Sequence, residues 1–142
     1  MPFHVVARAA WIIAIVGVSA FAVLRGGRVA RAVALANLGA WVVSLLVENR
    51  SNWLDPQWGV LLVDLGFLAV LLFYALRERP TWLLFAAAFQ LLSVLTHMAI
   101  LIDLGVHARA YLQGLAIWSY LVLLSLAIGS WRHWRDERLA ER

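Results

Sequence analysis

The sequence of 142 residues contains no cysteine, and only 14% of its residues are charged. Without cysteine, the chain has no disulfide bonds, no catalytic thiolate and no zinc or iron–sulfur site with cysteine ligands. Hydrophobic residues make up 64% of the chain, whereas soluble domains contain about 45–50%. A soluble core of this size cannot bury so much apolar surface, and the mean hydropathy of +0.84 indicates that a lipid bilayer is the solvent.

Sequence patterns that are typical of enzymes are also missing. The chain contains no HExxH or HxxxH metal motif, no glycine-rich phosphate loop and no serine nucleophile elbow. These absences favour a non-enzymatic role, and we predict no cofactor. They leave open a haem or divalent-metal site, for which His97 and Asp64 are the first candidate ligands.

Five apolar runs are each long enough for a membrane helix, which needs about 20 residues. They cover residues 5–24, 29–47, 57–76, 80–103 and 109–131, and a charged segment follows at residues 132–142. The predicted fold is therefore all-α. We expect a single transmembrane domain of five spans over residues 1–131, followed by a charged cytoplasmic tail that is compatible with a helix.

A signal peptide is the competing interpretation of the first run, with Val18-Ser19-Ala20 as the cleavage site. Three arginines, Arg25, Arg28 and Arg31, follow this run directly. Cleavage would place them at an exported N-terminus, where positive charge is disfavoured. We therefore expect the first run to be retained as a span.

The distribution of arginine predicts the orientation. Every basic residue is arginine, and five spans would put nine of them on one side of the membrane: Arg25, Arg28, Arg31, Arg77, Arg79, Arg132, Arg135, Arg138 and Arg142. Only Arg8, Arg50 and Arg109 fall on the other side. Because short cytoplasmic loops carry the excess of positive charge, we predict that the N-terminus is outside and the C-terminus is cytoplasmic.

The same distribution accounts for the high isoelectric point of about 10.7. In a soluble protein that value would suggest nucleic acid. Here the arginines lie between apolar runs, so we predict a lipid bilayer and no nucleic acid as the partner. Small size and the use of arginine alone favour a bacterial inner (plasma) membrane.

Polar residues recur along one face of the fourth run, residues 80–103. At about 100° per residue, Ser93 falls about 300° and His97 about 340° around the helix from Gln90. The three side chains therefore share roughly one sixth of the circumference. A histidine in a helix bundle often has no role beyond a hydrogen bond to a neighbouring helix. The other polar residues on this face make a functional site an equally good interpretation.

A single carboxylate lies inside the third run. Asp64 is about two turns from the start of that run, where insertion of a charged residue costs about 2.5–3.5 kcal/mol or more. A residue that costs so much is usually paired, protonated or functional, and Asp64 is therefore the strongest single candidate for a site.

Two further rows of residues recur at helical spacing. Asn37 and Glu48 share a face of the second run with Ser44, which favours a packing face with interhelical hydrogen bonds. Tyr111, Trp118 and Ser125 repeat every seven residues in the last run. We interpret that row as packing or interfacial residues.

The predicted orientation gathers the titratable residues near one mouth of the bundle. Most of them fall in the outer half or at the outer surface, and two extend the polar line toward the middle of the membrane. The candidate residues of this acid/His cluster are Asp64, His97, Gln90, Glu48, Asn37, Asp103 and His107. Carboxylates and histidines that face a wet cavity are typical of sites that bind or conduct protons or cations.

Three functions fit these residues. The first is a proton or cation site in a small inner-membrane protein that works as a homo-oligomer or within a larger membrane complex. The second is an accessory or assembly subunit without transport activity, whose polar residues pair with a partner. The third is a membrane-embedded metal- or haem-binding protein or enzyme, built on His97 and Asp64.

Overall fold

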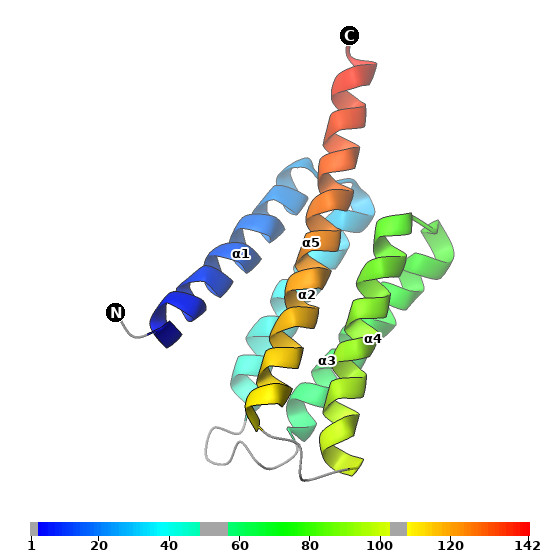
Figure 1. Ribbon diagram of the computed structural model, residues 1–142. Coiled ribbons are helices and arrows are strands. Elements are labelled where there is room, and N and C mark those ends of the chain that lie inside the picture. Colours follow the sequence, from blue (N-terminus) through cyan, green and yellow to red (C-terminus); the bar gives the residue numbers. More distant parts are fainter. Residues whose placement is uncertain (1–2, 49–56, 103–107) are drawn as a thin grey trace.

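The computed structural model describes residues 3–48, 57–102 and 108–142. Within these ranges it describes every side chain except those of residues 3–8, 108 and 109. Its fold is all-α, as predicted from the sequence. The described residues form five helices: α1 (Phe3–Arg25), α2 (Arg28–Val47), α3 (Trp58–Glu78), α4 (Thr81–Ile102) and α5 (Ala108–Ala140) (Figure 1).

Four of these helices, α2 to α5, are long and apolar enough to cross a membrane. In α1, the apolar stretch counted among the described residues is shorter, Ala9–Arg25. The outer faces of the bundle are apolar, with Leu46, Leu76 and Ile102 more than two-thirds exposed. The chain is therefore a polytopic membrane protein, while the fifth span at residues 5–24 and the orientation stay predictions.

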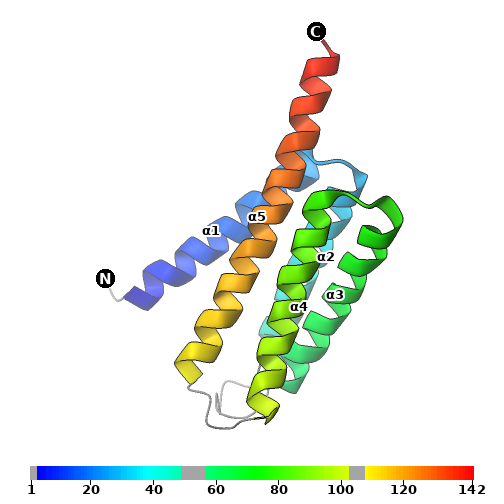
Figure 2. The same ribbon diagram turned by 45° about the vertical axis from the view of Figure 1, so that its right-hand side comes forward.

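The helices follow one another around a ring. α2 packs on α3, α3 on α4 and α4 on α5, and α1 contacts both α2 and α5. α2 and α5 also touch each other, less extensively. Toward its N-terminus, α1 leans away from the other helices (Figures 1 and 2).

The two ends of the bundle differ in composition. The α1–α2 and α3–α4 turns lie at the same end, which we call the arginine end after Arg25, Arg28, Arg31, Arg77 and Arg79 (Figure 1). The opposite end, which we call the cavity end, is formed by the C-termini of α2 and α4 and the N-termini of α3 and α5. α5 projects past the arginine end as one unbroken helix, which includes residues 132–140 of the predicted tail.

Each turn at the arginine end has a local cause. A Cβ atom on Gly26 would lie 2.4 Å from the carbonyl oxygen of Ala22 and 2.8 Å from Cβ of Ala30, so only glycine fits between α1 and α2. After α3, Arg79 adopts a left-handed conformation with φ of 52°, which ends the helix. Pro80 follows, and its carbonyl accepts the first hydrogen bond of α4, from the amide of Leu83.

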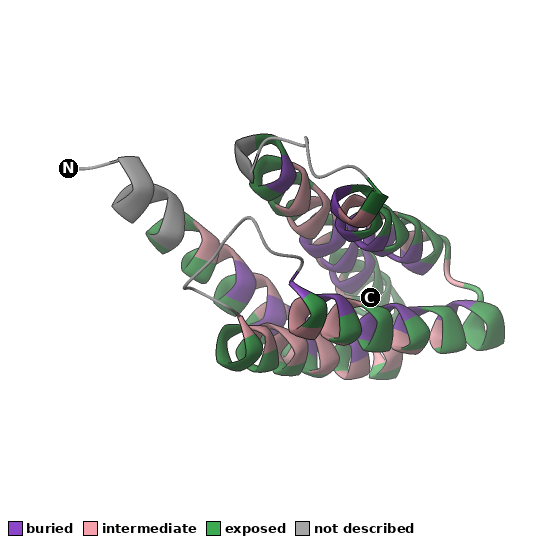
Figure 3. Ribbon diagram, turned by 90° about the horizontal axis from the view of Figure 1, so that it is seen from below, coloured by how far each residue is buried: buried purple, intermediate pink, exposed green. Residues whose placement is uncertain are grey.

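Small residues bring the helices close together in the half of the bundle next to the arginine end, which we call the arginine half. The other half, next to the cavity end, is the cavity half. The buried apolar cluster there consists of Ala22, Ala30, Val33, Ala34, Phe67, Leu71, Ala75, Leu83, Ala86, Ala87, Val122 and Leu126. Buried residues face the helix contacts, while exposed residues cover the outside (Figure 3). A Cβ atom on Gly129 of α5 would lie 2.4–2.6 Å from the Trp82 ring of α4. This contact therefore requires glycine.

Candidate functional site

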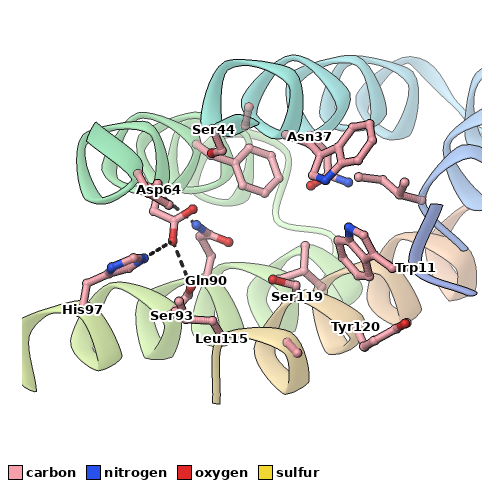
Figure 4. A pocket seen from close by; sticks show the side chains of 17 residues that line it. Trp11, Asn37, Ser44, Asp64, Gln90, Ser93, His97, Leu115, Ser119 and Tyr120 are labelled. Atoms are coloured by element: carbon pink, nitrogen blue, oxygen red, sulfur yellow. Dashed lines mark hydrogen bonds and ion pairs between the residues drawn. The ribbon is translucent and has the colours of Figure 1, made fainter. Parts of the chain in front are cut away.

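α3 and α4 position the first part of the site. Asp64 is the seventh residue of α3, which places it about 9 Å along the axis from the start of the helix at a rise of about 1.5 Å per residue. On α4, Gln90, Ser93 and His97 are all buried, and all three turn toward Asp64 (Figure 4). The polar face predicted on the fourth run is thus the face that packs against α3.

Three side chains surround Asp64. The Ser93 hydroxyl donates a hydrogen bond of 2.9 Å to Oδ2 of Asp64. Nε2 of His97 lies 3.2 Å from the same oxygen. Nε2 of Gln90 donates to the backbone carbonyl of Asp64 at 3.2 Å. Oδ2 of the carboxylate therefore has two polar neighbours, and the backbone of Asp64 is hydrogen-bonded to α4 (Figure 4).

His97 is almost completely buried, with 3% of its side chain exposed. Its Nδ1 atom is 2.7 Å from the Tyr111 hydroxyl of α5, and the two rings meet edge to face. Nε2 is close to Asp64 but is not aligned for a hydrogen bond with any described residue. The imidazole therefore lies between a phenol and a carboxylate, with one ring nitrogen facing each of them.

These contacts form a continuous polar chain across three helices, which we call the relay: Tyr111, His97, Asp64 and Ser93. Tyr111 was interpreted from the sequence as a packing or interfacial residue. That interpretation missed its hydroxyl. The spacing of seven residues between Tyr111 and Trp118 predicts that they share a helix face. It does not predict that the phenol contacts a histidine on another helix.

A cavity of about 380 Å³ opens beside the relay. All five helices contribute to its wall, which includes Asp64, Gln90, Ser93 and His97 together with the aromatic residues Trp11, Trp41, Phe67 and Tyr120. Asp64 and His97 lie at one side of the cavity in Figure 4, whereas Trp11 and Tyr120 lie at the other. The rings of Trp11 and Tyr120 contact edge to face with centroids 4.8 Å apart. Sequence reasoning found the polar wall and missed the aromatic one.

Of the other predicted residues, Asn37 of α2 also lines the cavity. Its Nδ2 atom is buried and has no hydrogen-bond partner among the described residues. Glu48 follows the end of α2 and is not among the residues that line the cavity. Asp103 and His107 lie outside the described residues.

The electrostatics of the cavity come from very few groups. Within the part of the chain that the structure describes, Asp64 is the only acid that lines the cavity, and His97 is the only lining histidine. None of the seventeen lining residues is arginine or lysine. The wall therefore has one site of negative charge, with a single titratable base next to it.

A metal ion finds few ligands here. Within residues 3–48, 57–102 and 108–142, no three histidine, cysteine, aspartate or glutamate side chains are grouped closely enough to hold one. Asp64 and His97 provide two of the three or four protein ligands that a zinc site uses.

No protein-family model, no curated protein and no solved structure matches this chain. The function therefore has to be inferred from the geometry of the relay and the cavity.

Proposed function

We propose that the protein is a five-span bacterial inner-membrane protein, with its N-terminus outside, whose Asp64–His97 pair binds a proton and exchanges it with the outer side. The observation that carries this proposal is the distance of 3.2 Å between Oδ2 of Asp64 and Nε2 of His97. An acid and an imidazole at this distance inside a membrane bundle form an ion pair when the imidazole is protonated, so the pair offers a place for one exchangeable proton.

The surroundings of the pair support proton exchange. From α5, Tyr111 is the titratable group that faces His97. The cavity residues of α1 and α2 are tryptophan, isoleucine, asparagine, alanine and serine, none of which titrates. Among the described residues, the titratable groups nearest to a proton on the pair are therefore Asp64, His97 and Tyr111, and Tyr120 lies farther along the cavity wall. The hydroxyl of Ser93 donates a hydrogen bond to the carboxylate.

Binding and exchange fit the bundle better than conduction through it. Between the cavity and the arginine end, the core contains the apolar cluster around Leu71, Leu83 and Leu126, all of them fully buried. Water needs polar partners to occupy such a region. In this conformation polar groups therefore adjoin Asp64 on the side of the cavity, and the apolar cluster separates it from the arginine end.

The accessory-subunit interpretation receives less support from the same contacts. It requires polar side chains that wait for a partner, but Asp64, Ser93 and His97 contact one another inside the chain. The expectation of a homo-oligomer or a larger complex stays a prediction. A zinc site would need protein ligands beyond the two that the pair supplies.

The test is an infrared titration of the protein in liposomes, which follows protonation of carboxyl groups as the pH changes. We expect a carboxyl band that disappears in Asp64→Asn. Its titration midpoint should move in His97→Gln, because the imidazole no longer interacts with the carboxylate.

Asp136→Asn is the matched control, since it makes the same chemical change on the exposed extension of α5, where 66% of the side chain is accessible. It should leave the Asp64 band and its midpoint unchanged. If the spectra of Asp64→Asn and Asp136→Asn lose the same signal, the proposal is wrong.

A further inference from the structure

The cavity is much larger than a proton site requires. A water molecule occupies about 30 Å³ in the liquid, and ligand pockets begin at about 300 Å³. At about 380 Å³, the cavity has room for a small organic molecule beside Asp64. Its wall then indicates which chemical class fits.

The charge of the wall selects for a cation. Among the described lining residues, Asp64 is the only acid, and none is an arginine or lysine that could hold an anion. Both side-chain neighbours of the carboxylate, Ser93 and His97, meet Oδ2. Oδ1 thus has no donor among the described residues and can accept one from a ligand.

The opposite side of the cavity selects for an apolar group. Trp11 and Tyr120 lie there, away from Asp64, and the amide of Asn37 and the hydroxyl of Ser119 lie between (Figure 4). Aromatic rings bury large apolar areas and interact favourably with other rings. A ligand that matches both sides has a positive head at Asp64 and an apolar body at Trp11.

We propose that the cavity binds a protonated amine with an apolar or aromatic body, in exchange for the proton on the Asp64–His97 pair. This inference rests on the proposed function. In the proposed exchange, the proton of the amine-free pair resides on His97, next to the Asp64 carboxylate. When the ammonium enters, its N–H donates to Oδ1 of Asp64, and the imidazolium releases one proton to the outside. The charge inside the bundle stays the same, so neither state leaves the partly buried carboxylate without a positive partner.

The test is calorimetric titration of the full chain in lipid nanodiscs with 2-phenylethylamine and its neutral counterpart 2-phenylethanol, with empty nanodiscs as blank. We expect the amine to bind at least about ten-fold more tightly than the alcohol, because a charge-assisted hydrogen bond is about twice as strong as a neutral one. Titrations in two buffers of different ionisation enthalpy should show one proton released per amine.

Variants separate the two sides of the cavity. Asp64→Asn should weaken amine binding at least about ten-fold while the alcohol is unaffected, whereas the control Asp136→Asn should change neither. Ser119→Phe fills the cavity without touching the carboxylate, and we expect it to weaken the amine by a similar factor. This second variant keeps the test decisive if Asp64→Asn does not fold.

Three results would overturn the inference: equal affinity for amine and alcohol, amine binding that survives both variants, or amine binding without proton release. Failure of the proposed function appears elsewhere, in the amine-free infrared titration, as a missing Asp64 signal. An intact Asp64 signal without amine binding would therefore reject the amine and retain proton exchange.

Discussion

Around Leu71 and Leu83 the helices meet through alanine, valine and leucine side chains that are at most 5% exposed, whereas around Asp64 the same helices enclose a cavity of about 380 Å³. The two halves of the bundle face the same lipid and are formed by the same helices. They differ in the side chains that face inward. Small residues let the backbones approach in the arginine half, whereas in the cavity half polar and aromatic side chains line an open space between the helices.

This difference has an energetic reason. In a bilayer, apolar burial between helices gains little, because lipid is as apolar as leucine, so close packing supplies most of the stability. The arginine half should therefore contribute most of the free energy of unfolding. The cavity half has less packing to lose, and its polar side chains must be satisfied by one another.

The sharpest way to break this comparison is a pair of identical leucine truncations. Leu71→Ala removes a fully buried side chain in the arginine half, and Leu115→Ala removes one that already borders the cavity. We expect Leu71→Ala to cost about 2 kcal/mol, the low end of the range for buried leucine because the transfer term is small in lipid. Leu115→Ala should cost less than about 0.5 kcal/mol, since this side chain is only partly buried and has fewer contacts to lose. Unfolding in mixed detergent micelles measures both, and equal losses would contradict the division into two halves.

A glycine pair tests the closeness of the contact in the arginine half. Gly129→Ala would place Cβ within 2.6 Å of the Trp82 ring, and we expect a loss of about 1–3 kcal/mol from overpacking. Gly66→Ala is the matched control, because no atom lies within 4 Å of its Cβ position. It should be neutral or stabilising by up to about 1 kcal/mol. Adding Trp82→Ala should recover part of the Gly129→Ala loss, and full additivity of the two changes would show that they do not interact.

A hydrogen bond between α4 and α5 on the cavity half should have a smaller effect. The indole of Trp118 donates to Oγ1 of Thr96 at 3.0 Å. Thr96→Val keeps the shape of the side chain and removes the acceptor. Hydrogen bonds between membrane helices average about 0.6 kcal/mol, and the same detergent unfolding experiment should show a loss of that size. A loss above about 2 kcal/mol would mean that side-chain hydrogen bonds and not packing stabilise this half.

The smallest effect is expected at the surface of the arginine end. Arg28 and Glu78 form an ion pair of 3.5 Å, with 86% of the arginine side chain exposed. Glu78→Gln should change the free energy of unfolding by less than about 0.5 kcal/mol, because water and salt screen such pairs. Comparison of unfolding at low and high salt provides the check, and a large, salt-dependent loss would be inconsistent with an exposed pair.

Several features of the site follow from local rules. The angle of 100° per residue places Gln90, Ser93 and His97 on one face of α4, and the cost of a carboxylate in lipid singles out Asp64 in α3. Neither rule identifies which polar side chain meets which. Glu48 belongs to the same predicted acid/His cluster as Asp64, and it is not among the residues that line the cavity.

Other features depend on helices that are distant in sequence. Tyr111 is 14 residues from His97, and Trp11 is more than 100 residues from Tyr120, although their rings are in contact. A helical repeat reports only which residues share a face. It does not report the distance or rotation of the neighbouring helix, so neither the relay nor the aromatic side of the cavity could be predicted.

By itself, the sequence determined that this protein is helical and belongs in a membrane, because apolar runs without enough charge have no other stable solvent. It also determined which helix faces are polar, because helical periodicity is a local property. Only the tertiary structure decided that Asp64 meets His97, that Tyr111 completes the relay and that a cavity remains beside them. These features depend on how closely α1 to α5 approach, and that distance is set by contacts such as Gly129 against Trp82 in the other half of the bundle.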